Sequence, residues 1–131
     1  MHFHHVGIAC RNIEEEARNI AAIHEVREQS PLVFDPAQNA ELMLLTLADG
    51  TRLELVAGPQ VETFLKKKIT YYHLCFEVSD IHAAIENLLQ TGAILLSPPK
   101  PALLFDGREV AFLQVSYGMI ELLSQKSRYA S

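Results

Sequence analysis

The sequence has few basic residues, few cysteines and no long apolar run. No run approaches the roughly 20 apolar residues that a membrane-spanning helix needs, and the N-terminus lacks the charged and apolar regions of a signal peptide. Lysine and arginine total 11 against 16 acidic residues, a net charge of −5. Nucleic acids and anionic membranes favour basic surfaces. We therefore expect a cytoplasmic protein that binds neither nucleic acid nor membrane.

The two cysteines, Cys10 and Cys75, are too few for a disulfide scaffold and fit the small buried residues of a cytoplasmic protein. The chain of 131 residues, 49% of them hydrophobic, is long enough for a substantial core. It contains no low-complexity segment or flexible linker. We therefore expect a single domain over residues 1–131.

The sequence contains an internal repeat. His5 begins a run that aligns with the run from His73, 68 residues later (73 − 5). Glu41 and Glu109 align at the same offset, and Glu54 aligns with Glu121 at 67 (121 − 54). A repeat at this spacing predicts two copies of one supersecondary unit. We place module one at about 1–58 and module two at about 70–126.

Each copy predicts the order β-α-β-β-β. Alternating apolar residues predict strands, a 3.6-residue apolar period predicts a helix after Asn12 and another after Asp80, and glycine and proline mark turns. Loops are expected at 30–39 and 97–108. The expected strands lie at 5–10, 25–29, 41–47, 52–56, 71–78, 93–96, 109–115 and 118–123, with a linking helix at 61–67.

Strand periodicity assigns the repeated histidines and glutamates to one face. Leu53 and Leu55 share a face, so Glu54 takes the other, and Glu121 has the same setting. If a pseudo-twofold axis relates the modules, His5, Glu54, His73 and Glu121 converge. Two imidazoles and two carboxylates suit a divalent ion such as Zn, Ni, Co, Fe or Mn, with Mg at the hard end, and leave positions open for substrate.

Other polar residues have a more ordinary interpretation. His4 is the rival of its neighbour His5, but periodicity and the repeat both favour His5. His2, His24 and His82 have no such support, and we expect His82 to be exposed and His24 to lie in a loop. The basic run 66–68 fits the solvated end of a short helix, with a phosphate contact for a nucleotide-tailed substrate as the alternative.

These residues resemble the vicinal oxygen chelate superfamily, which includes glyoxalase I, methylmalonyl-CoA epimerase, extradiol dioxygenases and bleomycin-resistance proteins. The resemblance covers nearly the whole chain, and within the superfamily the sequence looks most like the epimerases. It rests on His5-Val-Gly-Ile-Ala, Arg52-Leu-Glu54-Leu, the run from His73 to Ile85, and Met119-Ile-Glu121-Leu. It implies an α+β fold of two β-α-β-β-β modules related by pseudo-twofold symmetry, forming a metal-holding cup.

The resemblance also implies a chemistry. In this superfamily the metal polarises a carbonyl and stabilises the enolate left when an α-proton is removed. The epimerase pattern carries its base in a Pro-Glu-(Gln/His)-Gly stretch, where this chain has Pro36-Ala37-Gln38-Asn39. Glu41 and Glu77 are weak substitutes. Glu121 or Glu54 can serve instead as the metal-bound base of the glyoxalase I arrangement.

The first functional hypothesis is therefore a metal-dependent, epimerase-like isomerase or lyase acting on a small molecule, with a CoA or other thioester preferred. One alternative is a glyoxalase I-like lyase on a glutathione hemithioacetal. Another is a small-molecule binding protein that keeps the metal without turnover, favoured by the missing epimerase glutamate. A dioxygenase is disfavoured because Glu54 would fill a position that oxygen needs. We expect a homodimer, as is common among proteins with paired modules.

Overall fold

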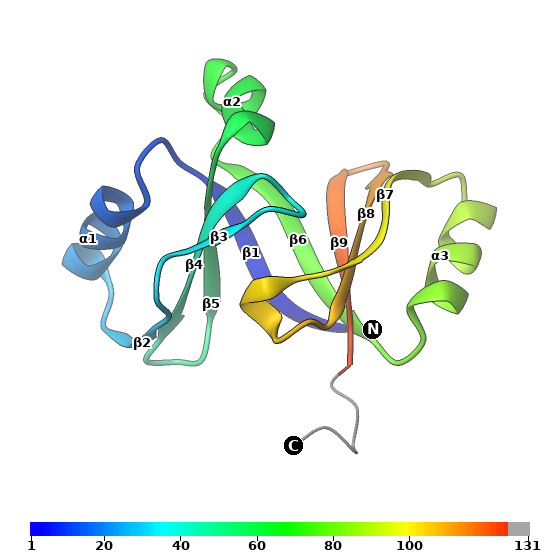
Figure 1. Cartoon of the computed structure of the whole chain (residues 1–131), viewed down its shortest axis with the longest axis horizontal. Coiled ribbons are helices and arrows are strands. Elements are labelled where there is room, and N and C mark those ends of the chain that lie inside the picture. Colours follow the sequence, from blue (N-terminus) through cyan, green and yellow to red (C-terminus); the bar gives the residue numbers. More distant parts are fainter. Residues whose placement is uncertain (126–131) are drawn as a thin grey trace. The chain divides into compact units, whose positions relative to one another are not determined.

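A computed structural model describes residues 1–125 of the chain, which form two compact units (Figure 1). The first unit comprises residues 5–72, and the second comprises residues 1–4 together with residues 73–125. Among residues 1–125, no helix is both long and apolar enough to cross a membrane. The predicted α+β class is confirmed. The expected end of module two at 126 lies outside the described residues.

The first unit is a sheet covered by a helix. Its strands lie in the order β2-β4-β5-β1, with β3 also paired to β4, and β1 runs parallel to β5 while the other pairs are antiparallel. The helix α1 contacts β4 and β5 (Figure 1). The elements are β1 (His2–Ala9), α1 (Ile13–Ile23), β2 (Val26–Gln29), β3 (Val33–Asp35), β4 (Ala40–Leu47), β5 (Arg52–Ala57) and α2 (Pro59–Lys66).

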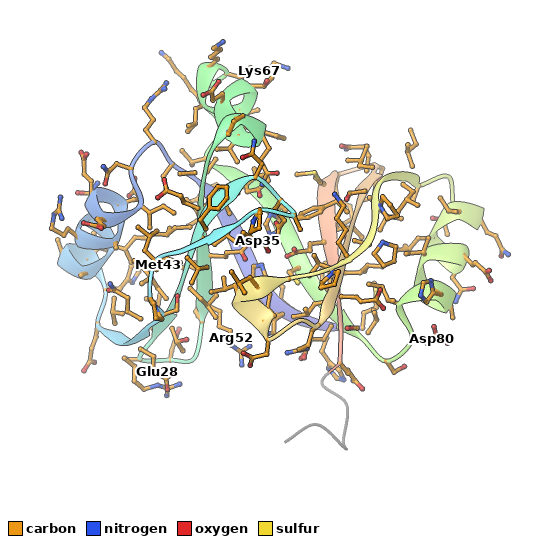
Figure 2. All side chains as sticks on the ribbon, in the orientation of Figure 1. Glu28, Asp35, Met43, Arg52, Lys67 and Asp80 are labelled. Carbon is orange, nitrogen blue, oxygen red and sulfur yellow. The ribbon has the colours of Figure 1, made fainter. Side chains whose placement is uncertain are left out.

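The core of the first unit lies between α1 and one face of this sheet. Ile13, Ala17 and Ile20 of α1 meet alternate residues of β4 and β5, including Met43, which Figure 2 shows extending from β4. Leu55 is fully buried in this cluster. The alternation means that the residues between these core positions face the other side of the sheet.

The second unit repeats this construction. Its strands lie in the order β6-β9-β8-β7, β6 runs parallel to β9, and the other pairs are antiparallel. The helix α3 covers a core that contains Ile81, Ile85, Ile120 and Leu122. The elements are β6 (Tyr71–Val78), α3 (Ile81–Gln90), β7 (Ile94–Pro101), a short 3₁₀ turn (Leu103–Phe105), β8 (Glu109–Val115) and β9 (Gly118–Ser124).

Matching N-caps begin the two main helices. The side chain of Asn12 accepts from the N–H of Glu15 at 2.9 Å, and that of Asp80 accepts from the N–H of Ala83 at 3.1 Å. Each cap satisfies one of the N–H groups that a helix leaves unpaired at its start. The two helices therefore start where the sequence predicts.

Two predicted loops were wrong in part. The stretch 30–39 contains the short strand β3, and β7 continues to Pro101 through residues expected to form a loop. Proline carries no N–H and is tolerated at sheet edges and bulges. β7 is the end strand of its sheet, and its pairing with β8 shifts register on both sides of Ser97. The edge position accounts for a strand that holds three prolines.

Candidate metal-binding residues

His5 and Glu54 lie side by side on the face of the first sheet opposite α1. The parallel pairing places Gly7 of β1 beside Glu54 of β5, and His5 lies two residues before Gly7 on the same face. His5 Nε2 is 3.4 Å from Glu54 Oε1, and the two side chains are 0% and 4% exposed. The structure thus brings together the first of the two predicted residue pairs.

His73 and Glu121 repeat this arrangement in the second unit. Cys75 of β6 pairs beside Glu121 of β9, and His73 lies two residues before Cys75. His73 Nε2 is 3.2 Å from Glu121 Oε1, and the side chains are 0% and 2% exposed. The ring of Phe112 packs edge-on against the His73 imidazole with 5.4 Å between ring centroids. This contact limits how far the imidazole can turn.

A carboxylate buried this deeply needs a positive partner, because removing a charge from water is costly. An imidazolium can supply it, and so can a cation shared between the imidazole nitrogen and the carboxylate oxygen. Each pair offers one nitrogen and one oxygen donor, which borderline divalent ions accept. The donor chemistry of both pairs therefore fits a divalent metal.

Glu41 faces away from Glu54. In the pairing of β4 with β5, Leu44 lies beside Glu54 while Glu41 lies beside Ala57, an odd number of residues away. Glu41 therefore points to the α1 side, where its charge raises the pKa of the Cys10 thiol. Its side chain is exposed. This position counts against Glu41 as a base beside His5 and Glu54.

Glu77 shares a face with His73 but is engaged elsewhere. Arg108 Nη2 donates to Glu77 Oε2, and Arg108 Nε donates to the carbonyl oxygen of Ser124 at 2.7 Å. The two interactions join β6, β9 and the start of β8. Glu77 therefore acts as a structural hydrogen-bond acceptor, and this counts against its use as a base.

The remaining histidines follow the sequence analysis. His4 points away from His5 and packs edge-on against Phe105, with ring centroids 5.4 Å apart. His2, His24 and His82 are exposed. The lysines at 66–68 are exposed at the end of α2, as expected for a solvated helix terminus.

The sequence pattern does not single out Asp35, which falls in a predicted loop. Asp35, which Figure 2 labels, ends β3. It is only 2% exposed. Its Oδ1 accepts from the N–H of Ala37 at 2.9 Å, and its Oδ2 accepts from the side-chain amide of Gln38 at 3.1 Å. An aspartate directly before Pro36 is a common turn-forming signal, but burial of its carboxylate cannot be inferred from that signal.

Comparisons with known proteins agree with the repeated fold. A family model described as glyoxalase/bleomycin resistance protein/dioxygenase superfamily matches residues 4–112. An ethylmalonyl-CoA/methylmalonyl-CoA epimerase of Cereibacter sphaeroides is 30% identical over 118 residues, covering 83% of this chain and 84% of the relative. A mitochondrial methylmalonyl-CoA epimerase of Dictyostelium discoideum is 27% identical over 115 residues, covering 83% of this chain and 68% of the relative.

The fold is shared with a solved structure as well. The crystal structure of methylmalonyl-CoA epimerase from Mycobacterium tuberculosis is similar with a TM-score of 0.82 at 18% identity, covering 97% of this chain and 89% of that chain. Similarity at this identity concerns the fold alone.

Proposed function

Because the chain belongs to the glyoxalase/bleomycin resistance protein/dioxygenase superfamily, we propose that it is a metal-dependent isomerase that moves the proton α to the carbonyl of a thioester. The observation that carries this proposal is the pair of buried histidine–glutamate contacts, one in each unit. Two sequence relatives that are named as epimerases of CoA esters support the choice of substrate class.

In this proposal, His5, Glu54, His73 and Glu121 hold one divalent ion together. The repeat supports this because both pairs are built by the same parallel strand pairing and face away from the helices. When bound, the ion supplies Lewis-acid polarisation of the substrate carbonyl. Zn, Ni, Co, Fe and Mn all suit this set of donors.

The proton transfer is assigned to the carboxylates. Glu121 or Glu54 accepts the α-proton as the C–H bond breaks, and the electron pair passes to the carbonyl oxygen. Return of a proton from water to the opposite face of the carbon would give the epimer, and loss of the accepted proton to water would restore the carboxylate. Both carboxylates lie among buried groups, where a lower effective dielectric strengthens their interaction with a developing charge.

Ala37 supports a competing function. It stands where the epimerase pattern has its glutamate, so the chain lacks that base. A metal-retaining binding protein without turnover would need no base, and a glyoxalase I-like lyase would use a metal-bound glutamate on a glutathione hemithioacetal. The His/Glu/His/Glu set favours the lyase among these two because it retains both carboxylates.

Metal content tests the assignment of the ligands. The purified protein should hold about one divalent ion per chain, and His73→Ala should reduce this below about 0.1 because a buried nitrogen donor is lost. His82→Ala is the matched control, since His82 is exposed on α3. Retention of a full complement of metal by His73→Ala, measured by mass spectrometry of the metals, would refute the ligand assignment.

Exchange of the α-proton tests the reaction. Methylmalonyl-CoA incubated with the metal-loaded protein in deuterated water should lose its α-proton signal in the NMR spectrum. Glu121→Gln should slow this by about 100-fold or more, because the carboxylate is lost. No exchange by the wild type would reject the epimerase, and isomerisation of the methylglyoxal–glutathione adduct would then select the lyase. Absence of both reactions would select the binding protein.

A further inference from the structure

A concave site lies in the first unit, on the α1 side of its sheet. It is a cavity of about 580 Å³ between α1 and the strands β1 and β5. Because His5 and Glu54 face the other side of the same sheet, this cavity is separate from the proposed metal site. The volume falls within the range of about 300–1,000 Å³ that is usual for small-molecule sites.

The floor of the cavity is apolar. Ile8 and Leu53 line it from adjacent strands, and Ile20 lines it from α1. Ile23 and Tyr71 stand at its opening with 77% and 78% of their surface exposed. The N–H of Ala9 donates to the carbonyl oxygen of Thr70 at 2.8 Å, which holds the segment before Tyr71 beside the end of β1. The site therefore presents apolar surface that a ligand could cover.

The polar lining is strongly acidic. Glu16, Glu25 and Asp49 line the cavity, no lysine or arginine does, and His24 is the one basic residue among the lining. The helix α1 ends at Ile23 with His24 as its C-cap, and its last turn contains no basic residue. The carbonyl groups of that terminus add partial negative charge. The cavity thus combines an apolar floor with a mainly acidic rim.

The carboxylate of Asp49 accepts a hydrogen bond from the turn that follows it. Its Oδ1 accepts from the N–H of Thr51 at 2.9 Å. Hydrogen bonds from Thr51 lower the pKa of Asp49 below its ordinary value. The electrostatic influence of the nearby His24 acts in the same direction. The three acidic residues of the lining are ionised at neutral pH, so this side of the cavity attracts a cation.

We propose that this cavity binds a small organic cation, a primary ammonium or guanidinium group carried on an apolar chain or ring. The apolar body would lie against Ile8, Ile20 and Leu53, and the cationic group would meet the carboxylates of Glu25 and Asp49. An organic anion of the same size would be repelled by the same rim. The binding of a cation here is independent of the proposed epimerase reaction.

The test uses n-hexylammonium as the probe, followed by the ¹H–¹⁵N NMR spectrum of the full chain at pH 8. Saturable shifts are expected at the lining residues Ala48, Thr51, Leu53 and Tyr71. Hexanol, which has the same chain without the charge, should bind about tenfold more weakly, and hexanoate should not bind. Shortening the probe to n-butylammonium should weaken binding by up to about fourfold per methylene removed.

A double variant locates the charge. Glu25→Gln with Asp49→Asn should weaken hexylammonium binding by about tenfold, because two carboxylates are removed from the rim. Glu86→Gln, on the exposed face of α3, is the matched control and should bind as the wild type does. Equal binding of hexanol and hexylammonium would overturn the proposal. So would saturable shifts confined to other residues, no shift up to about 10 mM probe, or unchanged binding by the double variant.

Discussion

At the scale of single residues, the surroundings of Cys10 show how burial changes chemistry. Cys10 is 4% exposed, and its Sγ lies 3.7 Å from the carbonyl oxygen of Val56. Burial, together with the charges of Glu16 and Glu41, raises the pKa of the thiol from 9.0 to about 11. The thiol therefore remains protonated in the folded protein at pH values where the unfolded chain loses the proton.

This shift predicts a loss of stability at alkaline pH. The contribution of the neutral thiol is fully present below pH 9 and is lost as the pH rises to about 11. The loss is expected to be about 2–3 kcal/mol of unfolding free energy. Urea unfolding of the wild type and of Cys10→Ala between pH 8 and 11 should show a smaller decline in the variant. Parallel curves would contradict the assignment.

Asp35 gives a second prediction at this scale. Replacement by alanine removes the buried carboxylate that accepts from the N–H of Ala37 and from the side-chain amide of Gln38. The expected cost is about 1–3 kcal/mol of unfolding free energy. Urea unfolding should show this for Asp35→Ala, while the exposed Glu86→Ala should change stability by less than about 0.5 kcal/mol. Equal effects would mean that the turn does not depend on the carboxylate.

At the scale of elements, the approach of the β3–β4 turn to the start of α2 depends on Gly58. Gly58 has φ +142°, and a Cβ there would lie 2.9 Å from the carbonyl oxygen of Asn39. That oxygen belongs to the backbone, so the contact cannot be relieved by turning a side chain. The turn that contains Ala37 can therefore approach the end of β5 this closely only because Gly58 has no side chain.

Replacement of two glycines separates strain from steric contact. Gly58→Ala should lower the unfolding free energy by about 2–4 kcal/mol, since it adds both an unfavourable φ and a close contact. Gly50→Ala, at φ +91° with no atom within 4 Å of a Cβ, should lower it by about 1–2 kcal/mol from the φ alone. Thermal unfolding of both variants gives the comparison. If Gly58→Ala lowered the unfolding free energy no more than Gly50→Ala, the close contact with Asn39 would not contribute to the loss.

At the scale of the whole molecule, the proposed metal site predicts how many ions the chain binds. A single shared ion predicts that His5→Ala and His73→Ala each abolish binding, because each removes a donor from the same site. Independent pairs predict two ions per chain and a loss of one in each variant. The single domain over residues 1–131, the homodimer and the cytoplasmic location stay predictions at this scale.

Isothermal titration of the metal-free chain should give about one ion, and the bound ion should raise the melting temperature. At 100 times the dissociation constant, the added stability is about 2.7 kcal/mol. A chelator should return the melting temperature to that of the metal-free chain. Two ions per chain, or unequal loss between the two histidine variants, would contradict a shared site.

Much of the site could be predicted because strand geometry is local. The side-chain period of two fixes the face of Glu54 once Leu53 and Leu55 are recognised as core, and the repeat transfers this to Glu121. The chain also predicts its helix starts, since Asn12 and Asp80 act on residues only three positions away. These features can be predicted without knowing the tertiary contacts.

Other features depend on strand register and on contacts between distant residues, which only the tertiary structure decided. Glu41 lies on the α1 side because of its register with β5, and Glu77 meets Arg108, 31 residues along the chain. The burial of Asp35 and the length of β7 likewise follow from neighbours that the sequence does not specify. The sequence by itself determined the fold class and one face of each module, because these follow from periodicity. Which acidic residues meet a histidine follows from strand register and long-range contacts.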